Sequence, residues 1–337
     1  MRRSLLTFAF SLGCALSLQA STIQIFYTEN ATNDVQASFY NTATNLVGPS
    51  TTIGNNTSGA DGIVIGPAGT VIYGGEITSN TVFQIRQNGV TGGGYPATAS
   101  TAGLLNSYLV AINQNSPTNV FAFDNSGDIA KVPIVSNVIQ TGTLLPALSG
   151  SDSNVTDLFW SNTNTAYYLS GTTGQNGDLG TINLVTGATA RLSGGTNLAT
   201  AQSSAFDPSS GLVLLFGQGQ VALFNPSTNT VGTAVTLPGA TAGAECNGAG
   251  STPNQLDLGT VDGSGDGFVA GCGDLMYFTY TASGVNSTTL TLTFTNYVAV
   301  NGIKDVAVLT SATPEPSSVA GILAALGGVL VWRRRRG

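Results

Sequence analysis

Histidine is absent from this 337-residue chain, and charged residues of either sign make up only 8% of it. The lack of histidine excludes Ser-His-Asp and Cys-His catalysis as well as metal sites built on imidazole. Basic residues are scarcest in the middle of the chain: between Ser21 and Ala312 four stand against sixteen acidic residues, a formal charge of −12. Because a surface of that sign repels nucleic acids and anionic lipids, we expect no nucleic-acid partner.

Amphipathic helices are also missing from the sequence pattern. Before residue 313, no stretch keeps apolar residues at positions i, i+3, i+4 and i+7 for three turns. Short runs of Val, Ile, Leu, Phe and Tyr instead alternate with turn residues such as Gly, Asn, Ser and Pro. This composition is typical of all-β proteins, so we expect one all-β domain over residues 21–311 and almost no helix within it.

The expected strands form a repeat, which is clearest over residues 204–237. Tight turns there separate four short apolar runs, at residues 204–206, 212–216, 220–224 and 230–236. Four antiparallel strands joined by short links make one blade of a β-propeller. The same order recurs at intervals of about 50 residues, the length that one blade needs. The first strands of the units begin near Ile63, Tyr108, Val155, Ser204, Leu256 and Ile303.

The two ends of this domain complement each other. Residues 303–309 read as a first strand with no strand after it, whereas residues 23–27, 35–40 and 46–48 read as second, third and fourth strands without a first. Joining the two pieces predicts a six-bladed β-propeller closed by its own N- and C-terminal strands. The pattern resembles bacterial propellers of the YVTN type. A β-sandwich or jelly roll is the alternative, because alternating strands alone do not distinguish these folds.

The first twenty residues have the layout of a secretory signal peptide. Arg2 and Arg3 precede an apolar segment, and small residues surround a candidate cleavage point between Ala20 and Ser21. We therefore expect residues 1–20 to be removed on export. Lipidation of Cys14 is an alternative, although the residues before it fit a lipobox poorly.

Residues 312–337 combine three features. A Pro-Glu-Pro motif comes first, then an apolar run from Val319 to Trp332, then an arginine cluster. The prolines keep the motif extended and open to a processing enzyme. As a helix, the apolar run would span about 21 Å of a hydrocarbon core about 30 Å thick, so we expect a short transmembrane helix with its arginines in the cytoplasm. The residues concerned are Pro314, Glu315, Pro316, Arg333, Arg334, Arg335 and Arg336.

This combination closely resembles the PEP-CTERM sorting signal of Gram-negative bacteria. The resemblance covers residues 313–337 only. It implies recognition and cleavage by an exosortase, transient insertion into the inner membrane, and a final place in the cell envelope or outside the cell, often alongside exopolysaccharide. An ordinary tail anchor is the alternative.

Two cysteines remain once Cys14 is removed with the signal peptide. Cys246 and Cys272 would form a disulfide in an oxidising compartment. The assigned strand order places both in links on the same face of the propeller, where they could meet without bending a strand. Two unpaired buried thiols are the alternative.

Acidic residues gather on that same face in the predicted arrangement. Asp61, Asp157, Asp257 and Asp305 lie near the start of the innermost strands and would point towards the mouth of the central tunnel. Carboxylates clustered without a basic partner suit a hard cation such as Ca²⁺. Alternatively, each carboxylate accepts hydrogen bonds from the backbone of its own turn. We expect no other cofactor.

The stretch 262–267 is similar to the start of an EF-hand loop but lacks the required Glu, which favours a plain hairpin turn.

These features assign no catalytic residue. We expect a non-catalytic exported protein of the cell envelope or exopolysaccharide matrix, with a structural or interaction role and with exosortase and the secretion machinery as partners. One alternative is a propeller that binds a glycan or protein through its acidic face with the help of Ca²⁺. A second is a metal-dependent propeller hydrolase or lactonase.

Overall fold

The structure is a computed structural model. It describes residues 22–29, 34–55, 60–75, 80–101, 103–105, 107, 109–124, 127–149, 155–161, 164–170, 177–198, 200–238, 256, 258–271, 273–282, 288–300 and 302–309. The predicted signal peptide, its cleavage point at Ala20–Ser21, the sorting signal with its short helix, Cys246, Cys272 and Asp257 all lie outside these residues. In the described part of the chain, no helix has the length and hydropathy needed to span a bilayer.

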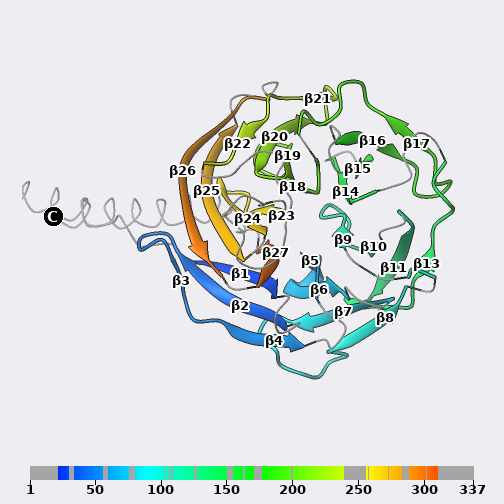
Figure 1. The fold of residues 1–337 in the computed structure, drawn as a ribbon. Helices are drawn as coiled ribbons and strands as arrows, with labels where there is room; N and C mark the ends of the chain where they lie inside the picture. The colour runs from blue at the N-terminus through cyan, green and yellow to red at the C-terminus, as the bar shows by residue number, and fades with distance from the viewer. Residues whose placement is uncertain are drawn as a thin grey trace, which may run out of the picture.

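Six antiparallel sheets are arranged radially around a central axis (Figure 1). We call them blades I to VI. Blade I contains β27 (Ile303–Val308), β1 (Thr22–Glu29), β2 (Asp34–Asn41), β3 (Leu46–Val47) and β4 (Thr51–Asn55). Blade II contains β5 (Ile63–Ile65), β6 (Thr70–Gly74), β7 (Thr81–Arg86) and β8 (Ala97–Ser100). Blade III contains β9 (Leu109–Ile112), β10 (Asn119–Phe123), β11 (Ile129–Val135), β12 (Val138–Ile139) and β13 (Thr143–Leu144).

The remaining blades follow the same order from the centre outwards. Blade IV contains β14 (Asp157–Trp160), β15 (Ala166–Ser170), β16 (Asp178–Ile182) and β17 (Thr189–Arg191). Blade V contains β18 (Ser203–Asp207), β19 (Leu212–Gly217), β20 (Gln220–Asn225), β21 (Thr230–Val231) and β22 (Val235–Thr236). Blade VI contains β23 (Leu258–Val261), β24 (Asp266–Gly271), β25 (Asp274–Ala282) and β26 (Leu290–Ala299). The 3₁₀ turn Pro67–Gly69 is the only helical element among the described residues.

The ring is closed by the two ends of the described chain. Strand β27 pairs antiparallel with β1, with Ile25 opposite Val308 and Tyr27 opposite Val306. Figure 1 shows this C-terminal strand, in orange, beside the N-terminal strand, in blue. The predicted closure is therefore confirmed, and the alternative of a β-sandwich is excluded. The chain is a six-bladed β-propeller.

Apolar packing between blades stabilises the ring. Six buried clusters each join one pair of neighbouring blades. Strand β19 shows how one strand serves two clusters. Leu212, Leu214 and Phe216 pack towards blade VI, and Val213 and Leu215 pack towards blade IV. Because successive side chains of a strand point to opposite faces, a strand between two blades must be apolar at every position.

The fourth strands differ from the prediction. In blades I, III and V two short pieces, rather than one continuous strand, pair with the same third strand. Pro49 lies between the two pieces in blade I. Proline has no backbone N–H for the ladder, and an outer edge tolerates such a break because no further strand depends on it.

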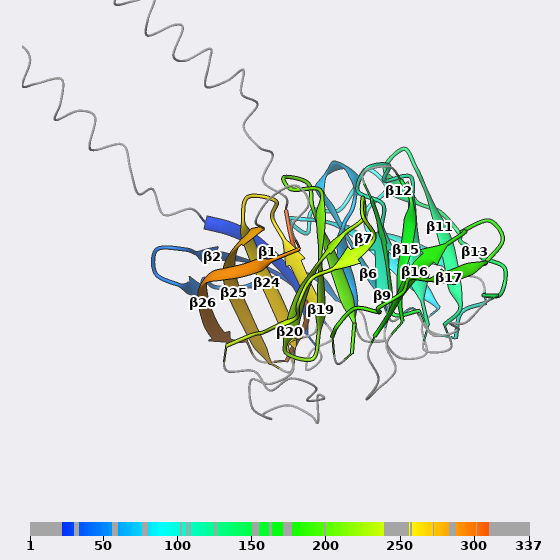
Figure 2. The same ribbon diagram turned by 90° about the horizontal axis from the view of Figure 1, so that it is seen from above.

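The propeller has two faces, seen edge-on in Figure 2. On the entry face lie the starts of the first strands, the links between blades and the links between second and third strands. On the exit face lie the ends of the first strands and the links between first and second and between third and fourth strands.

Candidate functional site

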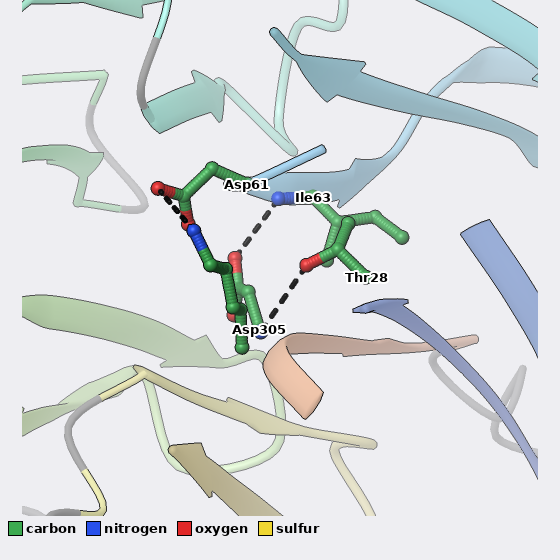
Figure 3. A network of polar contacts seen from close by, with 5 residues as sticks. Thr28, Asp61, Ile63 and Asp305 are labelled. Atoms are coloured by element: carbon green, nitrogen blue, oxygen red, sulfur yellow. Dashed lines mark hydrogen bonds and ion pairs between the residues drawn. The ribbon is translucent and has the colours of Figure 1, made fainter. Parts of the chain in front are cut away.

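First strands from all six blades surround a central cavity of about 160 Å³. Two of the predicted site residues, Asp157 and Asp305, line this cavity. Asp157 is the first residue of β14, and Asp305 is the third residue of β27. Asp61 lies two residues before β5, next to Asp305 in Figure 3. The fourth predicted residue, Asp257, lies outside the described residues.

A β-bulge positions Asp305. Tyr27 pairs with Val306 but Glu29 pairs with Ile303, so β27 carries one extra residue against β1. Such a bulge turns side chains away from the regular alternation. At the bulge, the backbone N–H of Asp305 donates a hydrogen bond to Thr28 Oγ1 at 3.3 Å.

The carboxylate of Asp305 joins two blades. Its Oδ2 accepts a hydrogen bond from the Ile63 backbone N–H in blade II at 2.9 Å, as Figure 3 shows. Its Oδ1 accepts one from the backbone N–H of Val306 at 2.7 Å. Asp305 is only 9% exposed, and this burial raises its pKa well above the ordinary value. The negative charges of Asp61 and Asp157 raise that pKa further, while the two N–H donors lower it.

Asp61 has a basic partner that the sequence-based prediction left out. Lys304 Nζ lies 3.9 Å from Asp61 Oδ2, and both side chains are largely buried. Lys304 precedes Asp305 in β27, so this ion pair also joins blades I and II. The expectation that these acids lack a basic partner is therefore wrong for Asp61, because ring closure brings the last described strand beside the link that leads into β5.

Asp157 connects blades IV and V in a similar way. Its Oδ2 accepts a hydrogen bond from Ser204 Oγ at 2.6 Å, and its Oδ1 accepts one from the Leu158 backbone N–H at 2.7 Å. Burial raises the pKa of Asp157 to about 7, even though these hydrogen bonds favour the charged form. The carboxyl group can thus gain or lose a proton near neutral pH.

The predicted Ca²⁺ site stays a prediction. Among the described residues, no three His, Cys, Asp or Glu side chains lie close enough to hold a metal ion. Asp257 was one of the four proposed ligands and is not among those residues.

The stretch 262–267 forms a hairpin turn, as predicted. Asp262 Oδ1 accepts hydrogen bonds from the backbone N–H groups of Ser264, at 2.7 Å, and Asp266, at 3.2 Å. The strands β23 and β24 pair on either side of this turn. The carboxylate therefore stabilises its own turn, as aspartate commonly does.

A second site was missed by the sequence reasoning. A groove of about 750 Å³ lies on the exit face between blades I and II, and Phe39, Arg86 and Tyr95 are among the residues that line it. Arg86 ends β7, and Tyr95 follows three glycines in the link to β8. An isolated basic residue and an aromatic residue flanking a Gly-rich link were the available signal. Phe39, from another blade, could not be added to them without the fold.

Comparisons with known proteins add no family. No protein-family model matches the chain, and no curated protein matches it. Among solved structures, the chain is similar to a protein of unknown function from Bacteroides thetaiotaomicron, with 12% identity, coverage of 75% of this chain and 68% of that chain, and a TM-score of 0.49. It is similar to virginiamycin B lyase from Staphylococcus aureus, with 12% identity, coverage of 84% and 86%, and a TM-score of 0.49. It is also similar to a putative 6-phosphogluconolactonase from Bacteroides fragilis, with 13% identity, coverage of 87% and 99%, and a TM-score of 0.48.

Proposed function

We propose that the chain is an exported propeller protein of the Gram-negative cell envelope or of the surrounding polysaccharide matrix, with a structural or interaction role and no catalytic one. The absence of a catalytic role is supported by the contacts of Asp61, Asp157 and Asp305, which together we call the tunnel mouth. Asp305 and Asp157 accept hydrogen bonds from the protein with both carboxylate oxygens, and Asp61 faces Lys304. Their carboxylates hold neighbouring blades together.

The cavity size supports the same conclusion. Sites for small molecules commonly enclose about 300–1,000 Å³, whereas the central cavity measures about 160 Å³. A substrate would have to displace hydrogen bonds that join the blades before it reached a carboxylate.

The resemblance of residues 313–337 to a PEP-CTERM signal, together with the signal-peptide layout of residues 1–20, supports export and processing by an exosortase. The test is expression in a Gram-negative host that has an exosortase and in the same host without it. We expect a protein cut at both ends in the envelope or medium of the first host. In the second host, the C-terminal segment should stay attached and hold the protein in the inner membrane.

A variant with alanine at Pro314, Glu315 and Pro316 should behave in the first host as the natural chain does in the second. Asp128→Ala, at an exposed position of the propeller, is the matched control and should be processed normally. Mass spectrometry of each fraction identifies both ends. Recovery of the natural chain in the cytosol with both ends uncut would contradict export, and equal retention in both hosts would indicate an ordinary tail anchor.

A second function is favoured by one observation. Asp157 has a pKa of about 7, which suits a general acid or base at neutral pH. A propeller hydrolase or lactonase that uses this group would lose turnover in Asp157→Asn. Assays on a panel of lactones with Ca²⁺ and with a chelator test this alternative, and we expect no turnover in either condition.

A further inference from the structure

The groove on the exit face has the features of a preformed ligand site. Its volume, about 750 Å³, lies within the range common for small-molecule sites. Its walls come from β1, β2 and β4 of blade I, from the two links of blade II on this face, and from the turn between β11 and β12. Phe39, Arg86 and Tyr95 form what we call the aromatic groove.

Arg86 presents an available guanidinium group. Its Cζ lies 5.3 Å from the centre of the Tyr95 ring, a cation–π geometry. Gly93, with a φ of +63°, passes so close that a Cβ there would lie 2.5 Å from Arg86 Nη2. Within the described residues, no ion pair or hydrogen bond occupies the donors of this guanidinium. The group is thus fixed in direction, and its planar fork remains available for a ligand.

The Tyr95 ring beneath Arg86 is also held in place. Its hydroxyl donates to the backbone carbonyl of Asn137 at 2.6 Å. Backbone hydrogen bonds run both ways between Gly92 and Tyr95, at 2.7 and 3.3 Å. A side chain that is already ordered loses little entropy when a ligand binds.

Phe39 and two amides complete the groove. Phe39 is 51% exposed and is the only aromatic residue among the exposed large apolar side chains of the described residues. Gln24 lies opposite it on β1, and Gln87 follows Arg86. In the part of the chain that the structure describes, neither glutamine amide is hydrogen-bonded to the protein. An exposed ring suits the C–H face of a sugar because its own face is electron-rich, and each free amide offers donors and an acceptor to hydroxyls.

The charge of the groove selects the kind of sugar. No Asp or Glu is among the described residues that line it, and Arg86 is its one basic residue there. The region between Ser21 and Ala312 carries only three other basic residues. The tunnel-mouth carboxylates lie on the opposite face, and at about 0.15 M salt charges farther away than about 8 Å are largely screened. An anionic ligand is therefore attracted at this groove, although the protein as a whole is acidic.

We propose that the aromatic groove binds a carboxylated glycan. A sugar ring stacks on Phe39, the amides of Gln24 and Gln87 bind its hydroxyls, and Arg86 forms a bidentate pair with its carboxylate. This proposal adds a binding site and a ligand class to the proposed function. It rests on that function only for the place, outside the cell or in its envelope, where the protein would encounter the glycan.

The test is calorimetric titration of the full-length protein, kept in mild detergent, with a hexamer of mannuronic acid and with a neutral hexamer of mannose. We expect the acidic hexamer to bind and the neutral one to bind at least about tenfold more weakly. Arg86→Gln should weaken binding of the acidic hexamer about tenfold and leave the neutral one unchanged. Phe39→Ala should weaken binding of both hexamers.

Matched controls separate the site from general effects. Arg191→Gln removes the same charge from a residue paired with Asp178 at 2.6 Å, and Val185→Ala trims an apolar side chain that is 81% exposed. Both should leave binding within about twofold of the natural chain. Phe39→Leu should weaken binding as Phe39→Ala does, with an unchanged melting temperature. That result would show that the loss of binding comes from the missing aromatic ring and not from misfolding.

Absence of binding to the acidic hexamer, equal binding of the two hexamers, or equal weakening by Arg86→Gln and Arg191→Gln would overturn the proposal. Localisation and processing are measured independently. A protein that is exported and cut but binds no glycan therefore refutes the groove alone, and a protein that binds but stays uncut in the cytosol refutes the proposed function alone.

Discussion

The tunnel mouth and the aromatic groove both contain charged side chains, yet they use them in opposite ways. At the tunnel mouth, both oxygens of Asp305 and of Asp157 accept hydrogen bonds from the protein itself. In the groove, the guanidinium of Arg86 is stacked on a ring but, among the described residues, has no hydrogen-bond acceptor. A polar group whose hydrogen bonds are made within the protein supports the fold, whereas a charged group that is held in place without such bonds is available to a ligand.

Burial accounts for this difference. A carboxylate removed from water needs hydrogen bonds or a cation to compensate for its lost hydration. The tunnel mouth supplies them from neighbouring blades, so these acids also hold the ring together. Arg86 is only partly buried, so solvent can compensate its charge and it needs no partner within the protein.

Replacing Asp305 should have the largest effect. Asp305→Ala leaves the Ile63 and Val306 N–H groups buried without an acceptor, and each loss costs about 1–3 kcal/mol. We expect the free energy of unfolding in urea to fall by about 2–4 kcal/mol. Asp128→Ala, at an exposed position, should change it by less than about 0.5 kcal/mol. Equal effects of the two variants would show that the tunnel-mouth acids do not support the ring.

The pH dependence of stability should be the next largest effect. The folded protein holds the Asp157 proton up to a pH of about 7, whereas an ordinary aspartate loses it near 3.8. Because the folded state binds the proton more tightly, the contribution of Asp157 is greatest below pH 4 and is lost as the pH rises to about 7. We expect the free energy of unfolding to fall by about 1–3 kcal/mol through this group between pH 4 and 8.

Urea titrations at several pH values measure that fall. Asp157→Asn cannot ionise and should show a flatter profile than the natural chain, with the difference confined to this pH range. Asp305, whose pKa is also raised, contributes in the same direction in both proteins. Identical profiles would contradict the assignment of a raised pKa to Asp157.

The smallest expected effect is the loss of stability when one of two basic side chains, Lys304 or Arg86, is replaced. Lys304→Met and Arg86→Gln each remove one positive charge, but only Lys304 lies beside a largely buried carboxylate. Because the two charges are 3.9 Å apart and both side chains keep some contact with solvent, we expect Lys304→Met to lower the free energy of unfolding by about 1 kcal/mol. Arg86→Gln should lower it by less than about 0.5 kcal/mol. A larger loss for Arg86→Gln would mean that Arg86 is structural, and the comparison between the two sites would fail.

Much of the fold could be read from local patterns. Strands were expected to begin near Ile63, Tyr108 and Ser204, and they begin at Ile63, Leu109 and Ser203. Alternating apolar residues and turn residues act over a few positions, so a single sequence reveals them. The split of the fourth strands was missed, because an outer strand has little apolar pattern and its pairing depends on the neighbouring strand.

The candidate sites were less predictable. The positions of Asp157 and Asp305 beside the tunnel could be derived, because both residues belong to first strands. The bulge that turns Asp305 towards Ile63 could not be derived, since it depends on the register between β27 and β1. Phe39 and Arg86 are far apart in the sequence and lie on different blades, so no local signal could place them in one groove.

By itself, the sequence determined that the chain is built from β-strands, that they repeat six times, and that its first and last strands complete one blade, because hydrophobic alternation and turn residues are local properties. Tertiary structure alone decided which ionisable side chains are bonded within the protein and which remain available to bind a ligand. Hydrogen bonds such as that from Ile63 to Asp305 join residues 242 positions apart, and such pairs form only when the closed ring brings its ends together.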